Sequence, residues 1–376
     1  MKNNKLQGAE YFENLAAEAA AKPLDQIDSS RPVWIFGGGN FGQSMARVML
    51  EHRLDVAGFV ETVPKTNEIL GLPVLDWAAL ARKNQDAQLV LGIFNRGVPF
   101  DQLAAIAQKN GFSSPVMPWA SYDQFGKALG WRYWLSARKF LLENLHRISN
   151  AAEIFADDES RRILERLCAF RLGLDLEFAS FQSQENQYFN SLTLPSLRGK
   201  VITYVDCGAY NGDTYIELVN SPEVSCQQAF LMEPDPNNFD KLVRSLEKND
   251  VRAICLPIAA AEKYEILTFS SGQGEGGAIG LGGDIHVAAV ALDQMLPATQ
   301  VDLLKIDVEG AEAPLLRGAR KMIQRSRPVI AMSLYHNPQD LWELPELISS
   351  ICADYEIYVR QHFYNSFDCV IYAVPK

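Results

Sequence analysis

Two acidic residues at the ends of consecutive apolar segments could bind a positively charged adenosine-type ligand. Asp206 lies at the end of Val201–Cys207, and Glu233 closes Ala229–Glu233. A dinucleotide site needs glycine at the first strand end, because pyrophosphate lies on bare backbone there. Aspartate would repel phosphate and suits an ammonium or a sulfonium, while Glu233 could accept both hydroxyls of a ribose. Each acid alone could be a solvated strand end or a helix N-cap, but the pair on consecutive strands favours a site.

The elements that position these acids follow from alternating apolar and amphipathic segments. This alternation predicts a mainly parallel sheet with seven principal strands, covered by helices. The strands are expected at 201–207, 229–233, 252–258, 301–308, 329–333, 356–360 and 369–373, and the helices at 213–219, 238–248 and 313–324. Two further strands, 265–270 and 286–291, should form a hairpin around a glycine-rich loop that we interpret as a lid. Parallel strands end at one crevice, so Asp206, Glu233, Asp307 and His336 should gather there.

Four segments between Tyr204 and Ala373 resemble the FkbM family of methyltransferases. They are Glu233-Pro234-Asp235-Pro236 with Phe239, Leu242 and Asn249; Leu292-Asp293; Leu304-Lys305-Ile306-Asp307-Val308-Glu309-Gly310-Ala311-Glu312; and Ser333-Leu334-Tyr335-His336 with Asp340-Leu341. The resemblance implies a class I methyltransferase fold and S-adenosylmethionine as the cofactor. It does not extend to residues 31–118.

The cofactor-binding residues that we expect belong to one loop and the strand end beside it. They are Asp206, Gly208, Ala209, Tyr210, Asn211, Gly212, Glu233 and Asp235. Tyr210 stands where many methyltransferases carry a third glycine, so its ring should point away from the methionine part of the cofactor or stack beside it. The methyl acceptor is expected to be a hydroxyl on a sugar, a glycan or a natural product.

The catalytic residues that we expect are His336, Asp307 and Glu309. His336 is the preferred general base, since an imidazole titrates near neutral pH. The alternative is a hydrogen-bonded turn histidine before Asn337-Pro338. Asp307 and Glu309 could bind substrate hydroxyls, orient the base or hold a divalent cation. The alternative for Glu309 and Glu312 is that they only favour a helix N-terminus. A metal ion is left unassigned.

A second glycine loop, Gly37–Gly42, follows an apolar segment and opens a helix in the first part of the chain. Gly37, Gly39 and Gly42 fit the dinucleotide pattern, and Glu61 stands where an acid can take a ribose hydroxyl. The loop could hold a nucleotide or a nucleotide-sugar. The same glycines could equally serve tight helix–strand packing in a dimerisation or docking module. Both interpretations stay open.

The fold expected for the whole chain is α/β. Residues 1–118 are interpreted as a small Rossmann-like domain, residues 119–198 as a helical bridge, and residues 199–376 as a methyltransferase domain with a Rossmann-like seven-stranded sheet. The bridge is rich in aromatic residues at helical spacing, which disfavours a solvated linker.

Composition narrows the partners and the location. The net charge is −11, which disfavours nucleic acid and anionic membranes. The six cysteines lack a CxxC pair and indicate a reducing compartment. Without an apolar run of about 18 residues or a secretory signal, a cytoplasmic protein is expected. Homo-oligomerisation stays open.

Two other functions compete with methyl transfer. The first is a non-enzymatic protein that keeps the same fold to hold a nucleotide-sugar or a partner, because a fold does not prove activity. The second, an NAD-dependent oxidoreductase using Gly37–Gly42, is less favoured since no proton-relay motif is recognisable.

Overall fold

The computed structural model describes residues 8–83, 86–269 and 285–376. It divides into two units. Unit 1 comprises residues 1–149, 162–182 and 363–367, and unit 2 comprises residues 150–161, 183–362 and 368–376. The chain therefore passes between the units several times. The three-domain division drawn from the sequence at residues 118 and 198 stays a prediction.

Unit 1 contains a five-stranded sheet. Its strands are β1 (Val33–Phe36), β2 (Val56–Val60), β3 (Glu68–Ile69), β4 (Leu72–Leu75) and β5 (Gln88–Leu91), in the order β3-β4-β2-β1-β5. All neighbours are parallel except β3, which is antiparallel to β4. Every residue of β1 and β5 is buried, as expected for a parallel sheet covered on both faces. The small Rossmann-like fold is confirmed.

Unit 1 also contains several helices. They are α1 (Ala9–Ala21), α2 (Asn40–Glu51), α3 (Trp77–Ala81), α4 (Phe100–Lys109), α5 (Pro118–Leu129), α6 (Arg138–Glu143), most of α7 (Leu145–Ala152) and α8 (Asp158–Arg171), and the 3₁₀ turn Ala179–Phe181. Among them, α2, α3 and α5 contact this sheet. Ahead of α5, which begins at Pro118, Val116 forms an isolated parallel bridge with Val90 of β5. Phe170 of α8 packs against Phe100 and Trp119, so the bridge aromatics are core residues.

Unit 2 contains the predicted seven-stranded sheet. Its strands are β6 (Val201–Cys207), β7 (Ser225–Met232), β8 (Ile254–Leu256), β12 (Leu303–Ile306), β13 (Val329–Ser333), β14 (Tyr355–Gln361) and β15 (Cys369–Pro375). The order is β14-β15-β13-β12-β6-β7-β8, and only β15 runs antiparallel to its neighbours. The strand order reverses between β12 and β6, which makes the carboxyl ends of these two strands the expected ligand position.

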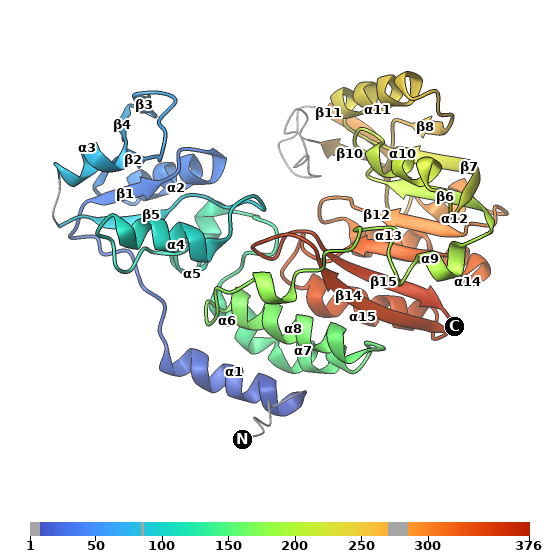
Figure 1. The fold of residues 1–376 in the computed structure, drawn as a ribbon, viewed down its shortest axis with the longest axis horizontal. Helices are drawn as coiled ribbons and strands as arrows, with labels where there is room; N and C mark the ends of the chain where they lie inside the picture. Colours follow the sequence, from blue (N-terminus) through green and yellow to red (C-terminus); the bar gives the residue numbers. More distant parts are fainter. Residues whose placement is uncertain (1–7, 84–85, 270–284) are drawn as a thin grey trace. The chain divides into compact units, whose positions relative to one another are not determined.

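Helices lie on both faces of this sheet (Figure 1). They are α9 (Leu194–Leu197), α10 (Asp213–Asn220), α11 (Pro236–Lys248), α12 (Leu292–Met295), α13 (Glu312–Gly318), α14 (Arg320–Ser326) and α15 (Asp340–Ile351). On one face, Leu218 of α10 and Leu242 of α11 share a buried cluster with Tyr204 and Leu231 of the sheet. Helices α12 to α15 contact one another. This arrangement is the expected class I methyltransferase fold.

The predicted hairpin is present, but it belongs to a separate small sheet. Strand β10 (Glu265–Phe269) pairs antiparallel with β11 (Ile285–Val290), and β11 pairs parallel with β9 (Ala259–Ala260). The single strand expected at 252–258 was therefore wrong in extent, because only 254–256 join the large sheet. The glycine-rich loop interpreted as a lid lies outside the described residues.

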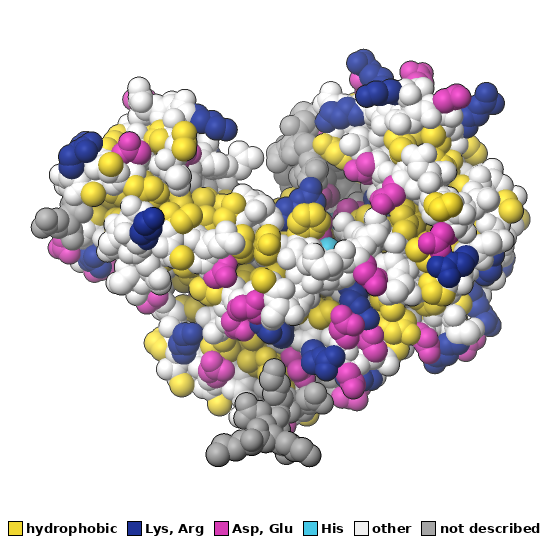
Figure 2. All heavy atoms as spheres, in the orientation of Figure 1, with side chains coloured by type: hydrophobic (Ala, Val, Ile, Leu, Met, Phe, Trp, Pro, Cys, Tyr) yellow, Lys and Arg dark blue, Asp and Glu magenta, His cyan; other side chains and the backbone are white. Residues whose placement is uncertain are grey.

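Charges of both signs are interspersed on the face shown in Figure 2. Among the described residues drawn there, neither Lys and Arg nor Asp and Glu cover a continuous area. In the described part of the chain, no helix has the length and apolar character needed to cross a bilayer.

Gly42 and Gly39, both in the Gly37–Gly42 loop of unit 1, should respond differently to substitution. The Cβ of Gly42→Ala would lie 2.0 Å from the carbonyl oxygen of Gly37, so we expect overpacking to cost about 1–3 kcal/mol. A Cβ at Gly39 meets no atom within 4 Å, which makes Gly39→Ala the matched control. Five of the six tryptophans belong to unit 1, so urea unfolding followed by tryptophan fluorescence measures the difference in the free energy of unfolding between the two variants. Equal midpoints for the two variants would contradict the packing described.

Candidate functional site

The loops that follow β6 and β12 touch at the point where strand order reverses. Gly208 has a φ of +86°, and a Cβ there would lie 1.8 Å from the carbonyl oxygen of Asp307. The amide of Asp307 donates to the carbonyl of Cys207 at 2.9 Å. Only glycine permits this approach, so residue 208 brings the predicted cofactor loop against the predicted catalytic loop.

The first amides of the cofactor loop are already bonded. Gly208 and Ala209 both donate to the carbonyl of Met232 at 3.0 Å, and Tyr210 donates to Glu233 Oε2 at 2.9 Å. These three amides are therefore not directed at a phosphate, unlike the amides of a pyrophosphate-binding loop. This bonding fits the ligand without phosphate that Asp206 suggested.

Glu233 is held at the end of β7 by two backbone amides. Its Oε2 accepts from Tyr210 and its Oε1 accepts from Asp235, each at 2.9 Å, and the residue is 6% exposed. Each oxygen keeps a second lone pair, so the carboxylate can still accept hydroxyl groups. Burial raises the pKa of Glu233 to about 7 despite the two amide bonds.

The other acids and polar residues of the predicted cofactor set have local partners. Asp235 caps α11 by accepting from the amides of Asn237 and Asn238, and Asn211 accepts from the amide of Asp213. Their contact with a cofactor stays a prediction. The ring of Tyr210, whose φ is 50°, lies 5.3 Å from Nζ of Lys241.

Asp206 does not face outward. Its carboxylate is fully buried, lies 2.9 Å from Nζ of Lys305 and accepts from the hydroxyl of Tyr204 at 2.8 Å. The cation that Asp206 meets is therefore a side chain of the protein. Sequence reasoning missed Lys305, although it stands directly opposite Asp206 in the β6–β12 register.

His336 and three carboxylates form a cluster beyond β12 and β13. The imidazole is fully buried, with Nδ1 at 2.6 Å from Glu312 Oε1. Its Nε2 lies 3.4 Å from Asp307 Oδ1 and 3.6 Å from Glu309 Oε2. The structure thus brings the three predicted catalytic residues together and adds Glu312, which also accepts from the amide of Val308.

The acids around His336 disfavour the role of general base, which stays a prediction. Burial alone would lower the pKa of the imidazole, but the carboxylates of Glu312 and Glu309 raise it well above its usual value. A ring that is already protonated at neutral pH cannot accept another proton. The alternative drawn from the sequence, a hydrogen-bonded histidine, agrees better with this geometry.

Asp307 and Glu309 are the carboxylates of this cluster that reach the surface. Their side chains are 27% and 18% exposed, whereas Glu312 is fully buried. The hydroxyl of Ser333, another residue that sequence reasoning missed, donates to Asp307 Oδ1 at 2.7 Å. Burial raises the pKa of Glu309 to about 8, and Asp307 is the more exposed of the two acids. Within the described ranges, no three His, Cys, Asp or Glu side chains are arranged to hold a metal ion.

The glycine loop of unit 1 uses its amides in a similar way. Gly37 donates to the carbonyl of Val60 at 2.9 Å, and Gly38 donates to Glu61 Oε1 at 3.1 Å. Gly42 is packed against Gly37, as the packing interpretation requires, while the space beside Gly39 is open. The nucleotide and docking interpretations both stay predictions.

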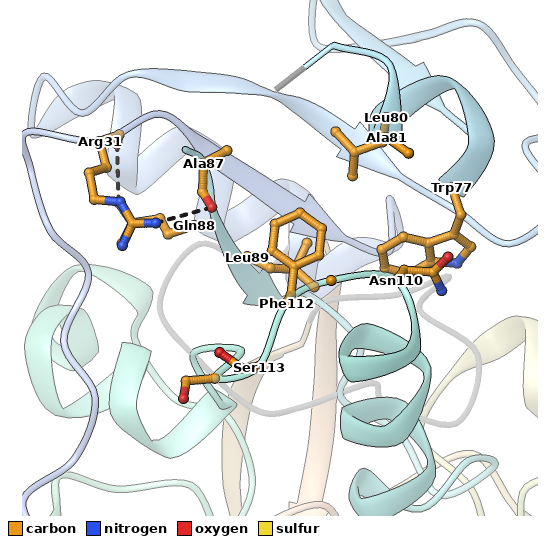
Figure 3. Close-up of a pocket in the computed structure, with 12 residues that line it drawn as sticks. Arg31, Trp77, Leu80, Ala81, Ala87, Gln88, Leu89, Asn110, Phe112 and Ser113 are labelled. Atoms are coloured by element: carbon orange, nitrogen blue, oxygen red, sulfur yellow. Dashed lines mark hydrogen bonds between the residues drawn. The ribbon is translucent and has the colours of Figure 1, made fainter. Parts of the chain in front are cut away.

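Unit 1 also has a cavity of about 380 Å³ at the amino ends of β1 and β5, away from its glycine loop (Figure 3). Its walls include the rings of Trp77 and Phe112. The guanidinium of Arg31 donates to the carbonyls of Asp86 and Ala87, and Asn110 donates to the carbonyl of Ile106. These polar groups are engaged within the unit, so they indicate no ligand class.

Two histidines of unit 2 should differ in charge. We expect His336 to be an imidazolium well above pH 7, and His362, whose pKa burial lowers to about 4, to be neutral at pH 7. Ring-nitrogen NMR of the five histidines, assigned with His336→Asn and His362→Asn, measures this. A raised histidine pKa adds stability below about pH 6.5 that is lost as pH rises through the folded-state value. A His336 signal titrating near 6.5 would contradict the cluster geometry.

Part of the chain is similar to a known protein family, and its fold is similar to that of a solved structure. Residues 206–366 match the family model described as the methyltransferase FkbM domain. The methyltransferase FkbM from Methylobacillus flagellatus KT is 21% identical, with a TM-score of 0.73 over 96% of this chain and 98% of that chain. A precorrin-6y C5,15-methyltransferase from Geobacter metallireducens GS-15 is 14% identical, with a TM-score of 0.32 over 54% of this chain and 97% of that chain. No curated protein matches the chain. Residues 206–366 are therefore similar to the methyltransferase FkbM domain, which confirms the resemblance seen in the four sequence segments.

Proposed function

We propose that unit 2 transfers a methyl group from S-adenosylmethionine to a hydroxyl oxygen of a sugar, a glycan or another small molecule. The observation that carries this proposal is the buried carboxylate of Glu233, which two amides hold at the end of β7 and whose oxygens can still accept ribose hydroxyls. An adenosine ligand without phosphate matches that set of donors and acceptors. The FkbM family match supports methyl transfer as the reaction class.

The cofactor would be held by the residues that follow β6 and β7. Glu233 would accept the ribose hydroxyls, and the backbone of Gly208–Gly212 would line the methionine part. S-adenosylmethionine supplies a methyl group on a sulfonium, which is already an excellent leaving group. The chain therefore has to orient the acceptor and receive its proton.

We assign Asp307 as the group that receives the proton of the acceptor hydroxyl. It is partly exposed at the carboxyl end of β12. The hydroxyl of Ser333 donates to its carboxylate, and the ring of His336 lies beside that carboxylate. A hydroxyl that donates to Asp307 would be oriented and deprotonated as its oxygen attacks. His336 Nε2, 3.4 Å from Asp307 Oδ1, helps to position the carboxylate, and Glu309 can bind a neighbouring hydroxyl of the acceptor.

The first test is cofactor binding. We expect S-adenosylhomocysteine to raise the melting temperature of the full chain by binding the folded state, and Glu233→Ala to remove most of the shift. Because burial raises the pKa of Glu233 to about 7, its charged form is lost as pH falls through that value. The affinity measured by calorimetry should therefore weaken from about pH 8 to about pH 6.

Glu223→Gln is the matched control, since Glu223 pairs with Arg198 on the surface of the same unit. It should bind like the wild type. A wild-type chain that fails to bind S-adenosylhomocysteine at millimolar concentration would contradict the proposal that the protein is a methyltransferase. Titrations with NAD and with nucleotide-sugars then distinguish the two competing functions. Binding of NAD would indicate the oxidoreductase, and binding of a nucleotide-sugar would indicate the non-enzymatic binding protein.

The second test is the acceptor atom. The wild type should transfer the labelled methyl group of S-adenosylmethionine to at least one member of a panel of sugars, nucleotide-sugars and glycans. Mass spectrometry should place it on oxygen. Asp307→Asn keeps the shape of the side chain and should lower turnover by roughly 10²–10⁴-fold while leaving S-adenosylhomocysteine affinity nearly unchanged. Methylation on nitrogen or carbon, or full turnover in Asp307→Asn, would contradict the assigned roles.

A further inference from the structure

Lys305 is a buried ammonium at the centre of the large sheet. Its side chain is 6% exposed and lies in β12, directly opposite Asp206 of β6. Its Nζ is 2.9 Å from Asp206 Oδ1 and donates to the carbonyl of Gly208 at 2.6 Å. It also lies 5.6 Å from the ring centroid of Tyr188. One side chain therefore connects the strand end to the glycine loop that follows it.

Stability alone gives little reason for this ion pair. Two charges in a central sheet lose their hydration, and apolar residues of similar volume are often as stable or more stable there. Burial lowers the pKa of Lys305, but Asp206 and Asp307 outweigh that effect and raise it, so the side chain stays cationic. What an apolar residue could not provide is the charged donor to the carbonyl of Gly208.

That donor fixes one side of the cofactor loop. With its carbonyl held by Lys305, Gly208 keeps the left-handed φ of +86°, and its amide donates to the carbonyl of Met232. Two residues later, the amide of Tyr210 reaches Glu233. The carbonyl bond to Lys305 and the amide bonds to β7 thus restrain the same three-residue turn from opposite sides.

We propose that Lys305 is a positioning residue for the cofactor site: its ammonium holds the Gly208 carbonyl and thereby the turn that presents Tyr210 to Glu233. This inference rests on the proposed function for the identity of the ligand. The restraint on the loop itself does not depend on that ligand, so it can be measured in the full chain alone.

A double-mutant cycle of Lys305→Met and Asp206→Asn tests the proposal. Lys305→Met leaves a buried carboxylate without its cation and should lower the melting temperature. The double variant removes both charges, keeps an acceptor for Tyr204 and should recover much of that loss. Because the Gly208 carbonyl still lacks its donor, hydrogen exchange of the Tyr210 amide should accelerate at least about tenfold in the double variant. Its dissociation constant for S-adenosylhomocysteine should rise by a similar factor.

Lys321→Met, at an exposed position of α14, is the matched control and should change neither quantity. A double variant with recovered stability, wild-type exchange at Tyr210 and wild-type affinity would show that Lys305 is only half of a structural ion pair. Faster exchange with no ligand binding even in the wild type would keep the loop restraint and reject the cofactor assignment. Those two outcomes separate failure of this inference from failure of the proposed function.

Discussion

The pairing of β6 with β12 is the constraint on which the site in unit 2 depends. The two parallel strands meet where strand order reverses, with Asp206 opposite Lys305. Because both strands end at the same edge, their loops must pass each other there, and Gly208 leaves room for the backbone of Asp307. This close approach of the two backbone segments therefore places the predicted cofactor loop next to the carboxylate cluster.

Burial then separates the charged groups of unit 2 into two kinds. Asp206 with Lys305, and Glu312 with His336, are fully or almost fully buried and satisfy each other. A charge inside a protein needs such a partner, so these pairs hold backbone and side chains in place. Asp307 is partly exposed and rests on the buried Glu312–His336 pair. The buried pairs hold the structure in place, whereas Asp307 and Glu309 are the acids of the cluster that reach the surface.

The two glycine loops show that a shared bonding scheme does not define a shared ligand. In both, the first glycine donates to the carbonyl at the end of the neighbouring strand, and a following amide donates to an acid just beyond it. Strand–loop–helix geometry alone produces this scheme. The loop of unit 2 is distinguished by the carboxylate cluster next to it, and in unit 1 the described residues place no comparable cluster beside Glu61.

Local pattern was enough to predict most of the strands, the glycine loops and the position of Glu233, since each is encoded within a short stretch of chain. The same pattern could not reveal that Asp206 is neutralised by Lys305, or that β9 leaves the large sheet. Nor could it show that the pKa of His336 is raised, because that shift depends on acids from the loop after β12 and the start of α13. Residue types and the succession of strands along the chain come from the sequence, whereas charge states depend on distances that exist only after the strands pair.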